Sequence, residues 1–138
     1  MSARAERIGH GELCFGCGLA NLFGLQLEAE RDGAVVRGRF FVKQDHQGPG
    51  GTLHPGVLTT ALEEVAGLAV RAAGHDPAVV LRLELDQLSP VRLGVFVILE
   101  AELAGEATPW EAVARASSLV EGDCRELARA RVHYAPGP

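Results

Sequence analysis

The chain has 138 residues, 47% of them hydrophobic, which is typical of one domain with a sizeable core. Its 18 acidic and 13 basic residues leave a formal net charge of −5, so we expect no nucleic-acid partner and no attraction to anionic membranes. No apolar run resembles a signal peptide or a membrane span, which predicts a cytoplasmic protein, and the three cysteines are expected to be reduced.

The first predicted strands form a β-hairpin. Residues 1–24 are glycine-rich and aperiodic, and we expect an irregular lead there. Residues 24–30 then alternate apolar and polar side chains, and residues 34–42 are rich in Val and Phe. Asp32 and Gly33 lie between the two runs, where they suit a tight turn.

One long helix and four more strands follow. Pro55 suits the first turn of a helix over residues 54–73, and Gly74 is well placed to end it. Beyond the helix the apolar period returns to two, which predicts strands over residues 79–86, 93–103, 110–120 and 124–134. This order predicts a single α+β domain spanning residues 1–138, with an antiparallel sheet of about six strands and one helix on its face.

The predicted helix is apolar on two sides. One stripe, expected to pack on the sheet, consists of Leu58, Ala61, Leu62, Val65, Leu68, Ala69 and Ala72. The opposite side carries small residues, among them Gly56, Thr59 and Gly67. Glu63 is the only charge on that side, whereas Glu64 lies nearer the boundary, where a long side chain can reach water. Because a small chain has no second layer to cover this side, we expect a second copy to cover it.

Glu63 is the first candidate functional group. A carboxylate at such a covered junction is either a paired structural group or a group whose reactivity is raised by partial desolvation. The structural alternative is an ion pair with Arg71 or with an arginine of a neighbouring chain, and the helical pattern leaves both open.

Three motifs resemble one known group of enzymes. They are Cys14-Phe15-Gly16-Cys17-Gly18 with Asn21 and Gly24-Leu25; Gly51-Thr52-Leu53-His54-Pro55-Gly56 with Glu63 beyond it; and Leu88-Ser89-Pro90-Val91. Together they resemble the phenylacetate-pathway type of acyl-CoA thioesterase in the hotdog superfamily. The resemblance implies a sheet wrapped around the helix, homodimers whose sheets join edge to edge, sites between subunits, and further pairing into tetramers.

The resemblance also implies an activity. Glu63 corresponds to the carboxylate that hydrolyses an acyl-CoA thioester, as nucleophile or general base, and no cofactor or metal is expected. Amides at the start of the partner subunit's helix would stabilise the oxyanion, and Thr59 and Gly67 would admit the substrate. Pro55 departs from the family's His-Gly-Gly because it has no N–H, so another amide would have to serve. The candidate replacements are the amides of Gly56, Gly50 and Gly51.

The lost donor supports an alternative function, a non-catalytic domain that binds acyl thioesters or an acyl carrier. Gln47 is predicted to orient substrate or water beside Gly48, although a solvated loop glutamine fits equally well. His54 is a further candidate site residue. A role in helix capping or loop orientation is favoured over proton transfer.

Two further groups are weaker candidates. Arg125, Arg129 and Arg131 would suit the phosphates of coenzyme A, but we favour a solvated face on which they pair with acids. Cys14 and Cys17 have zinc-like spacing, with His10 as a third donor. Because Cys124 is the only remaining thiol that could be a fourth ligand, no metal site is predicted, and buried structural residues are favoured. The acids available to the arginines are Glu84, Asp86 and Glu126.

Overall fold

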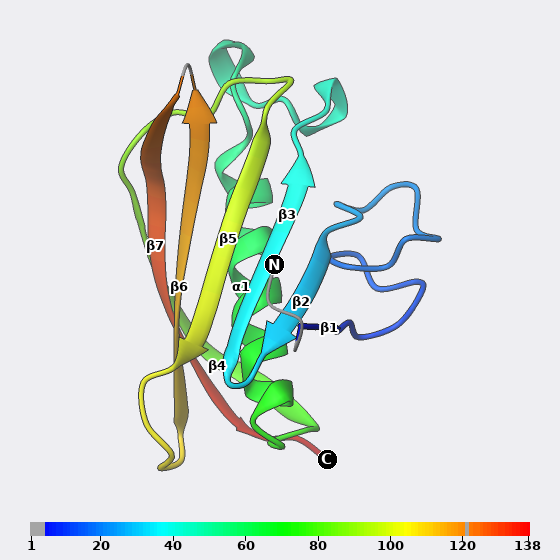
Figure 1. Ribbon diagram of the computed structural model, residues 1–138, viewed down its shortest axis with the longest axis vertical. Helices are drawn as coiled ribbons and strands as arrows, with labels where there is room; N and C mark the ends of the chain where they lie inside the picture. The colour runs from blue at the N-terminus through cyan, green and yellow to red at the C-terminus, as the bar shows by residue number, and fades with distance from the viewer. Residues whose placement is uncertain (1–4, 121) are drawn as a thin grey trace.

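The computed structural model describes residues 5–120 and 122–138, in which one antiparallel sheet curves around one long helix (Figure 1). The sheet order is β1-β2-β3-β5-β6-β7-β4, and every neighbouring pair of strands is antiparallel. The elements in chain order are β1 (Glu6–Arg7), β2 (Glu28–Asp32), β3 (Val35–Phe41), η1 (Gln44–His46), η2 (Pro49–Gly51), α1 (Pro55–Ala72), β4 (Ala78–Gln87), β5 (Phe96–Leu103), β6 (Trp110–Val120) and β7 (Asp123–Pro136). This arrangement confirms the predicted α+β hotdog architecture.

Helix α1 begins and ends within a residue of its predicted bounds. Pro55 occupies the first turn, where its missing N–H costs nothing, and the His54 ring accepts a hydrogen bond from the Gly56 amide at 2.8 Å. At the other end Gly74 adopts a φ of 87°, which a residue with a side chain rarely adopts. Of the helices in the described part of the chain, none is both long and apolar enough to cross a membrane.

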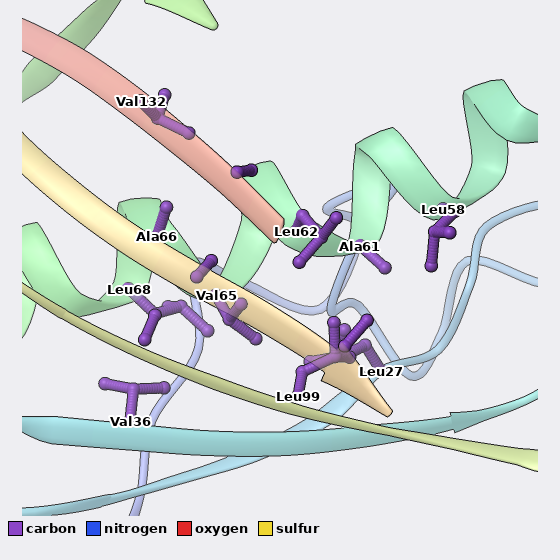
Figure 2. Close-up of a cluster of buried hydrophobic side chains, with 14 of the residues drawn as sticks. Leu27, Val36, Leu58, Ala61, Leu62, Val65, Ala66, Leu68, Leu99 and Val132 are labelled. Carbon is purple, nitrogen blue, oxygen red and sulfur yellow. The ribbon is translucent and has the colours of Figure 1, made fainter. Parts of the chain in front are cut away.

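The predicted apolar stripe of α1 forms the centre of the core. Leu58, Leu62, Val65 and Leu68 are fully buried and lie against inward side chains of the sheet (Figure 2). Gly38 of β3 allows this close packing, because a Cβ atom there would lie 3.2 Å from Val65 Cγ1. Strands β3, β5 and β6 each bury one face against the helix.

The second side of α1 is covered in part by the chain itself. Ala66 and Val70 are buried, because the curved sheet brings β7 and β4 into contact with this side of the helix. A second copy is therefore not needed to cover these two residues. Gly56 remains exposed and Thr59 half-buried nearer the start of the helix.

The structure differs from the predicted strands in their number, in the starts of β2 and β5, and in the alternation of β4. Strand β2 begins at Glu28 and β5 at Phe96, where residues 24 and 93 were predicted. The sheet has seven strands, because Glu6–Arg7 in the expected irregular lead pairs with β2. In β4 the predicted alternation fails at its start: Leu81 is 59% exposed, and the register shifts between Val80 and Arg82. This β-bulge turns an apolar side chain away from the helix, which period-two counting does not anticipate.

Candidate active site

Glu63 is held at the junction of helix α1 and strand β7. The hydroxyl of Tyr134, a residue of β7 that is only 3% exposed, donates to Glu63 Oε2 at 3.3 Å. The same hydroxyl lies 3.2 Å from the Glu63 backbone carbonyl oxygen. Within the described residues no hydrogen bond reaches Glu63 Oε1, so one carboxylate oxygen is oriented while the other is free to react.

The surroundings of Glu63 perturb its acidity. Burial, together with the negative charge of Glu64, raises the pKa of Glu63 above its usual value, and the Tyr134 hydrogen bond opposes that rise. Burial and the nearby Glu63 carboxylate in turn raise the pKa of Tyr134, so its hydroxyl stays a neutral donor. The carboxylate is thus partly desolvated and keeps one neutral hydrogen-bond partner.

The ion pair with an arginine, which was the structural alternative for Glu63, does not form among the described residues. Arg71 lies about two turns further along the helix. Its guanidinium Nη1 pairs with Asp76 Oδ2 at 3.2 Å. None of the salt bridges found among the described residues includes Glu63. An arginine of its own chain therefore does not neutralise this carboxylate.

Gly67 makes room for the pair formed by Glu63 and Tyr134. A Cβ atom at position 67 would lie 3.3 Å from Glu63 Oε2 and 3.3 Å from the Tyr134 hydroxyl. Both distances are tighter than ordinary van der Waals contact, so a side chain would displace one of the two groups. The predicted small-residue face thus has a direct structural purpose at this position.

The start of α1 does not supply the free amides that the sequence suggests. The Gly56 amide donates to the His54 ring, and the Val57 and Leu58 amides lie 2.9 and 3.3 Å from the His54 carbonyl oxygen. Pro55 has no N–H. The Gly56 amide is therefore already engaged, and His54 has the capping role that the sequence favoured. The reason is local: a histidine at the N-cap position satisfies the first free amide of its own helix.

The preceding loop presents the remaining candidates. Gly50 and Gly51 are exposed and have φ values of 73° and 77°, which turn the chain sharply in front of the helix. Gly48 is packed tightly, since a Cβ atom there would lie 2.7 Å from His54 Cα. Gln47 is exposed at the edge of this loop.

Two other predicted site residues do not face Glu63. Thr59 is directed toward the helix backbone, and Arg131 lies on the opposite face of the sheet. The Thr59 hydroxyl donates to the Pro55 carbonyl oxygen at 2.8 Å. On β7 the inward positions are occupied by buried residues such as Ala130 and Val132, so the alternating arginine at 131 lies on the outer face. That outer face is opposite to the one from which Tyr134 contacts Glu63.

Two of the three arginines pair with acids, and one of these acids, Glu126, is among those predicted. Arg129 forms a salt bridge with Glu126, and Arg131 contacts Glu111 at 3.1 Å. Arg125 is exposed on the same strand. Strict alternation would place Leu127 on the same face as Arg125 and Arg129, but it is buried, because the register of β6 and β7 shifts beside it. The structure therefore does not bring the arginines to Glu63.

The burial of Glu64 is the largest difference between the structure and the prediction. It is only 7% exposed, although its helical position suggests a route to water. The N-terminal lead folds over it: His10 Nδ1 lies 2.6 Å from Glu64 Oε2, and Cys14 Sγ lies 3.5 Å from the same oxygen. Although burial opposes the change, hydrogen bonds from His10 and Cys17 lower the pKa of Glu64. Neither the burial of Glu64 nor the Tyr134 contact was predicted, because both depend on chain segments far away in sequence.

The match to a family model lies over the loop, the helix and the next two strands. Residues 50–105 match the Thioesterase superfamily. The chain has the hotdog fold of these thioesterases. The comparison with curated proteins gave no match.

Solved structures of other proteins have a similar fold. A thioesterase superfamily protein has a TM-score of 0.75 and 20% identity over 86% of this chain, which spans 60% of that protein. A putative thioesterase of Ralstonia eutropha, described as related to phenylacetic acid degradation, has a TM-score of 0.68 and 20% identity, covering 80% of this chain and 84% of its own. A hypothetical thioesterase of Streptococcus pneumoniae, solved with coenzyme A, has a TM-score of 0.66 and 23% identity, covering 78% of this chain and 86% of its own.

Proposed function

We propose that this protein hydrolyses acyl-CoA-type thioesters, with Glu63 as the reacting carboxylate. The observation that carries the proposal is the state of Glu63: half-buried, oriented by Tyr134, and without a cationic partner in the described chain. A carboxylate in that state combines raised reactivity with a defined direction. The family match over residues 50–105 and the similar structure solved with coenzyme A support the choice of substrate class.

Glu63 has two possible roles in the reaction. As a nucleophile, its carboxylate attacks the thioester carbonyl carbon, the carbon–sulfur bond breaks, and the thiolate leaves; water then hydrolyses the mixed anhydride. As a general base, Glu63 takes a proton from water while the water oxygen attacks the same carbon. The tetrahedral intermediate then expels the thiolate, which is protonated. Both routes release a carboxylic acid and a free thiol.

The oxyanion formed in either route needs a hydrogen-bond donor. The helix amides from Gly56 to Leu58 are engaged by His54, so we assign this role to the exposed amides of the Gly50–Gly51 turn in the partner subunit, because the turn of the same chain lies more than two helical turns away from Glu63. The positive end of the α1 dipole still favours negative charge in front of the helix. Gln47, exposed in the same loop, is placed as a residue that orients substrate or water.

We further propose that the active form is a homodimer joined through β4. This strand is ten residues long and lies at the outer edge of the sheet, with Val79, Val80 and Leu81 all exposed. An open edge with exposed apolar residues favours pairing with a second strand. A dimer joined this way would form the site between two subunits, and tetramers built from two dimers are a further expectation.

The test of this function is turnover by the purified protein. A panel of acyl-CoAs is incubated with wild type and with Glu63→Gln, and release of free thiol is measured. We expect Glu63→Gln to lose at least about a hundredfold in kcat, in the range usual for a general base. Glu102→Gln, at an exposed position on the outer face of β5, is the matched control and should keep full activity. Equal turnover by wild type and a correctly folded Glu63→Gln variant would rule out this role.

A non-catalytic thioester-binding domain is the second candidate. Pro55 lacks the usual donor and the next amides are engaged, which favours binding without turnover. Replacing Pro55 by Gly separates the two functions. A large gain in turnover would indicate a weakened or inactive natural site. Unchanged turnover in an active enzyme would mean that the donor lies elsewhere, as we propose for Gly50 or Gly51.

A further inference from the structure

Four potential metal ligands meet beneath the N-terminal lead. They are His10, Cys14 and Cys17 from the lead and Glu64 from helix α1, and their ligand atoms all lie within 4.8 Å of one another. We propose that these four side chains bind one zinc ion in a closed, structural site. The Cys14–Gly18 motif, for which thioester hydrolysis has no use, is explained by this site.

The distances are close to those of a tetrahedral zinc site. Zinc–ligand bonds of about 2.0–2.3 Å place ligand atoms about 3.3–3.8 Å apart. Cys14 Sγ lies 3.5 Å from Glu64 Oε2, and Cys17 Sγ lies 3.9 Å from His10 Nδ1. His10 Nδ1 and Glu64 Oε2, at 2.6 Å, share a hydrogen bond that must widen when an ion replaces its proton. The His10 side chain is 31% exposed, so its ring has room to move.

The backbone around the cluster is shaped to bring these groups together. A Cβ atom at Gly16 would lie 2.3 Å from Glu64 Oε1, so only glycine there lets the helix carboxylate reach the loop. A Cβ atom at Gly18 would lie 2.3 Å from the Glu12 carbonyl oxygen. The Gly18 amide donates to the Cys14 carbonyl oxygen at 2.8 Å, which closes the turn between the two cysteines.

A second set of contacts orients the ligands themselves. The His10 amide donates to Cys17 Sγ at 3.1 Å, an outer hydrogen bond of the kind that stabilises a metal-bound thiolate. The Leu27 amide donates to the Gly16 carbonyl oxygen at 3.0 Å and fastens the loop to the residues that lead into β2. The ordered backbone of the lead therefore positions three of the donors, and the core helix α1 positions the fourth, Glu64.

The donor set indicates both the metal and its role. Two thiolates, one imidazole and one carboxylate suit zinc, whereas magnesium and calcium prefer oxygen ligands. Because the protein supplies all four ligands, no position is left for water or substrate, which is typical of a structural site. The ion would fasten the lead to α1 at Glu64, next to Glu63. This role is independent of thioester hydrolysis.

The first experiment measures metal content. Wild-type protein purified without chelator is analysed for zinc by mass spectrometry after gel filtration, alongside Cys14→Ser, Cys17→Ser and Cys124→Ser. We expect about one zinc per chain in wild type and in Cys124→Ser, whose cysteine is exposed and outside the cluster. Both other variants should lose at least about nine-tenths of it. Equal zinc in all four proteins would overturn the proposal.

A second experiment does not depend on the variants folding. Wild-type protein is stripped with a chelator under reducing conditions and titrated with Co²⁺, which reports sulfur ligation and tetrahedral geometry by its absorption. We expect a sulfur-to-cobalt band that saturates at one equivalent and disappears when Zn²⁺ is added. Stripped protein that remains folded by circular dichroism and shows no such band would mean that the cluster is only a hydrogen-bonded network. Neither result depends on whether the protein hydrolyses thioesters.

Discussion

Replacing Tyr134 by Phe tests whether a hydrogen bond from β7 positions the reacting carboxylate. The ring stays in its buried place, and only the hydroxyl that contacts Glu63 Oε2 at 3.3 Å and the Glu63 carbonyl oxygen at 3.2 Å is removed. Both distances are long for a hydroxyl donor, so we assign about 1 kcal/mol, the middle of the range for a neutral hydrogen bond, and not the larger value usual for a charged acceptor. By transition-state arithmetic the same energy corresponds to about fivefold in kcat.

Two measurements separate positioning from general destabilisation. Denaturant unfolding should show a loss of about 1 kcal/mol, and steady-state kinetics should show kcat lower by about fivefold with KM little changed. Thr60→Val is the matched control, because its hydroxyl donates to the Gly56 carbonyl oxygen at 2.9 Å and does not touch Glu63. It should lose a similar amount of stability and keep its kcat. If Tyr134→Phe loses stability but keeps full kcat, the positioning role is wrong.

Three other changes probe the same site, the loop before it and the β4 edge. Gly67→Ala should lower kcat several-fold, because its Cβ would lie 3.3 Å from Glu63 Oε2 and crowd that oxygen. This loss is expected although alanine favours a helix over glycine by about 1 kcal/mol. An unchanged kcat in steady-state assays would contradict it. Burial, and to a smaller extent the positive charge of Lys43, lower the pKa of His46, so the neutral ring is favoured in the folded state. Unfolding free energy should therefore be fully present above about pH 6.5 and decrease as the pH falls through that value, and a His46→Gln variant measured by denaturation across this range should lack that part of the decrease. Leu81→Lys, on the exposed part of the β4 edge, should shift the protein from dimer to monomer in size-exclusion chromatography with its circular dichroism unchanged; a persisting dimer would place the interface elsewhere.

Elements defined by local pattern were predicted well. Strand β3, the helix with Pro55 at its start and Gly74 beyond its end, and strand β6 all appear close to their expected bounds, whereas β2 begins at Glu28 and not at residue 24. Each depends on side-chain period and turn residues within a short window. The direction of Glu63, opposite to the main apolar stripe, follows from the same arithmetic of the helix.

Features that depend on a shifted register were not predicted. The exposed Leu81 and the buried Leu127 both lie beside irregularities in strand pairing, where one extra residue reverses the faces that follow. A single strand carries no sign of where its partner shifts. The engaged Gly56 amide was missed for a different reason, since the capping by His54 was foreseen but its effect on that donor was not.

The sequence by itself determined the fold class, the long helix and the direction of its carboxylate at position 63, because these follow from periodicity and capping along neighbouring residues. Only the tertiary structure decided which groups meet that helix. Tyr134 reaches Glu63 from the last strand, and the cysteine loop closes over Glu64 from the N-terminal lead. Such contacts join segments fifty or more residues apart through the curvature of the sheet, and no local pattern encodes that curvature.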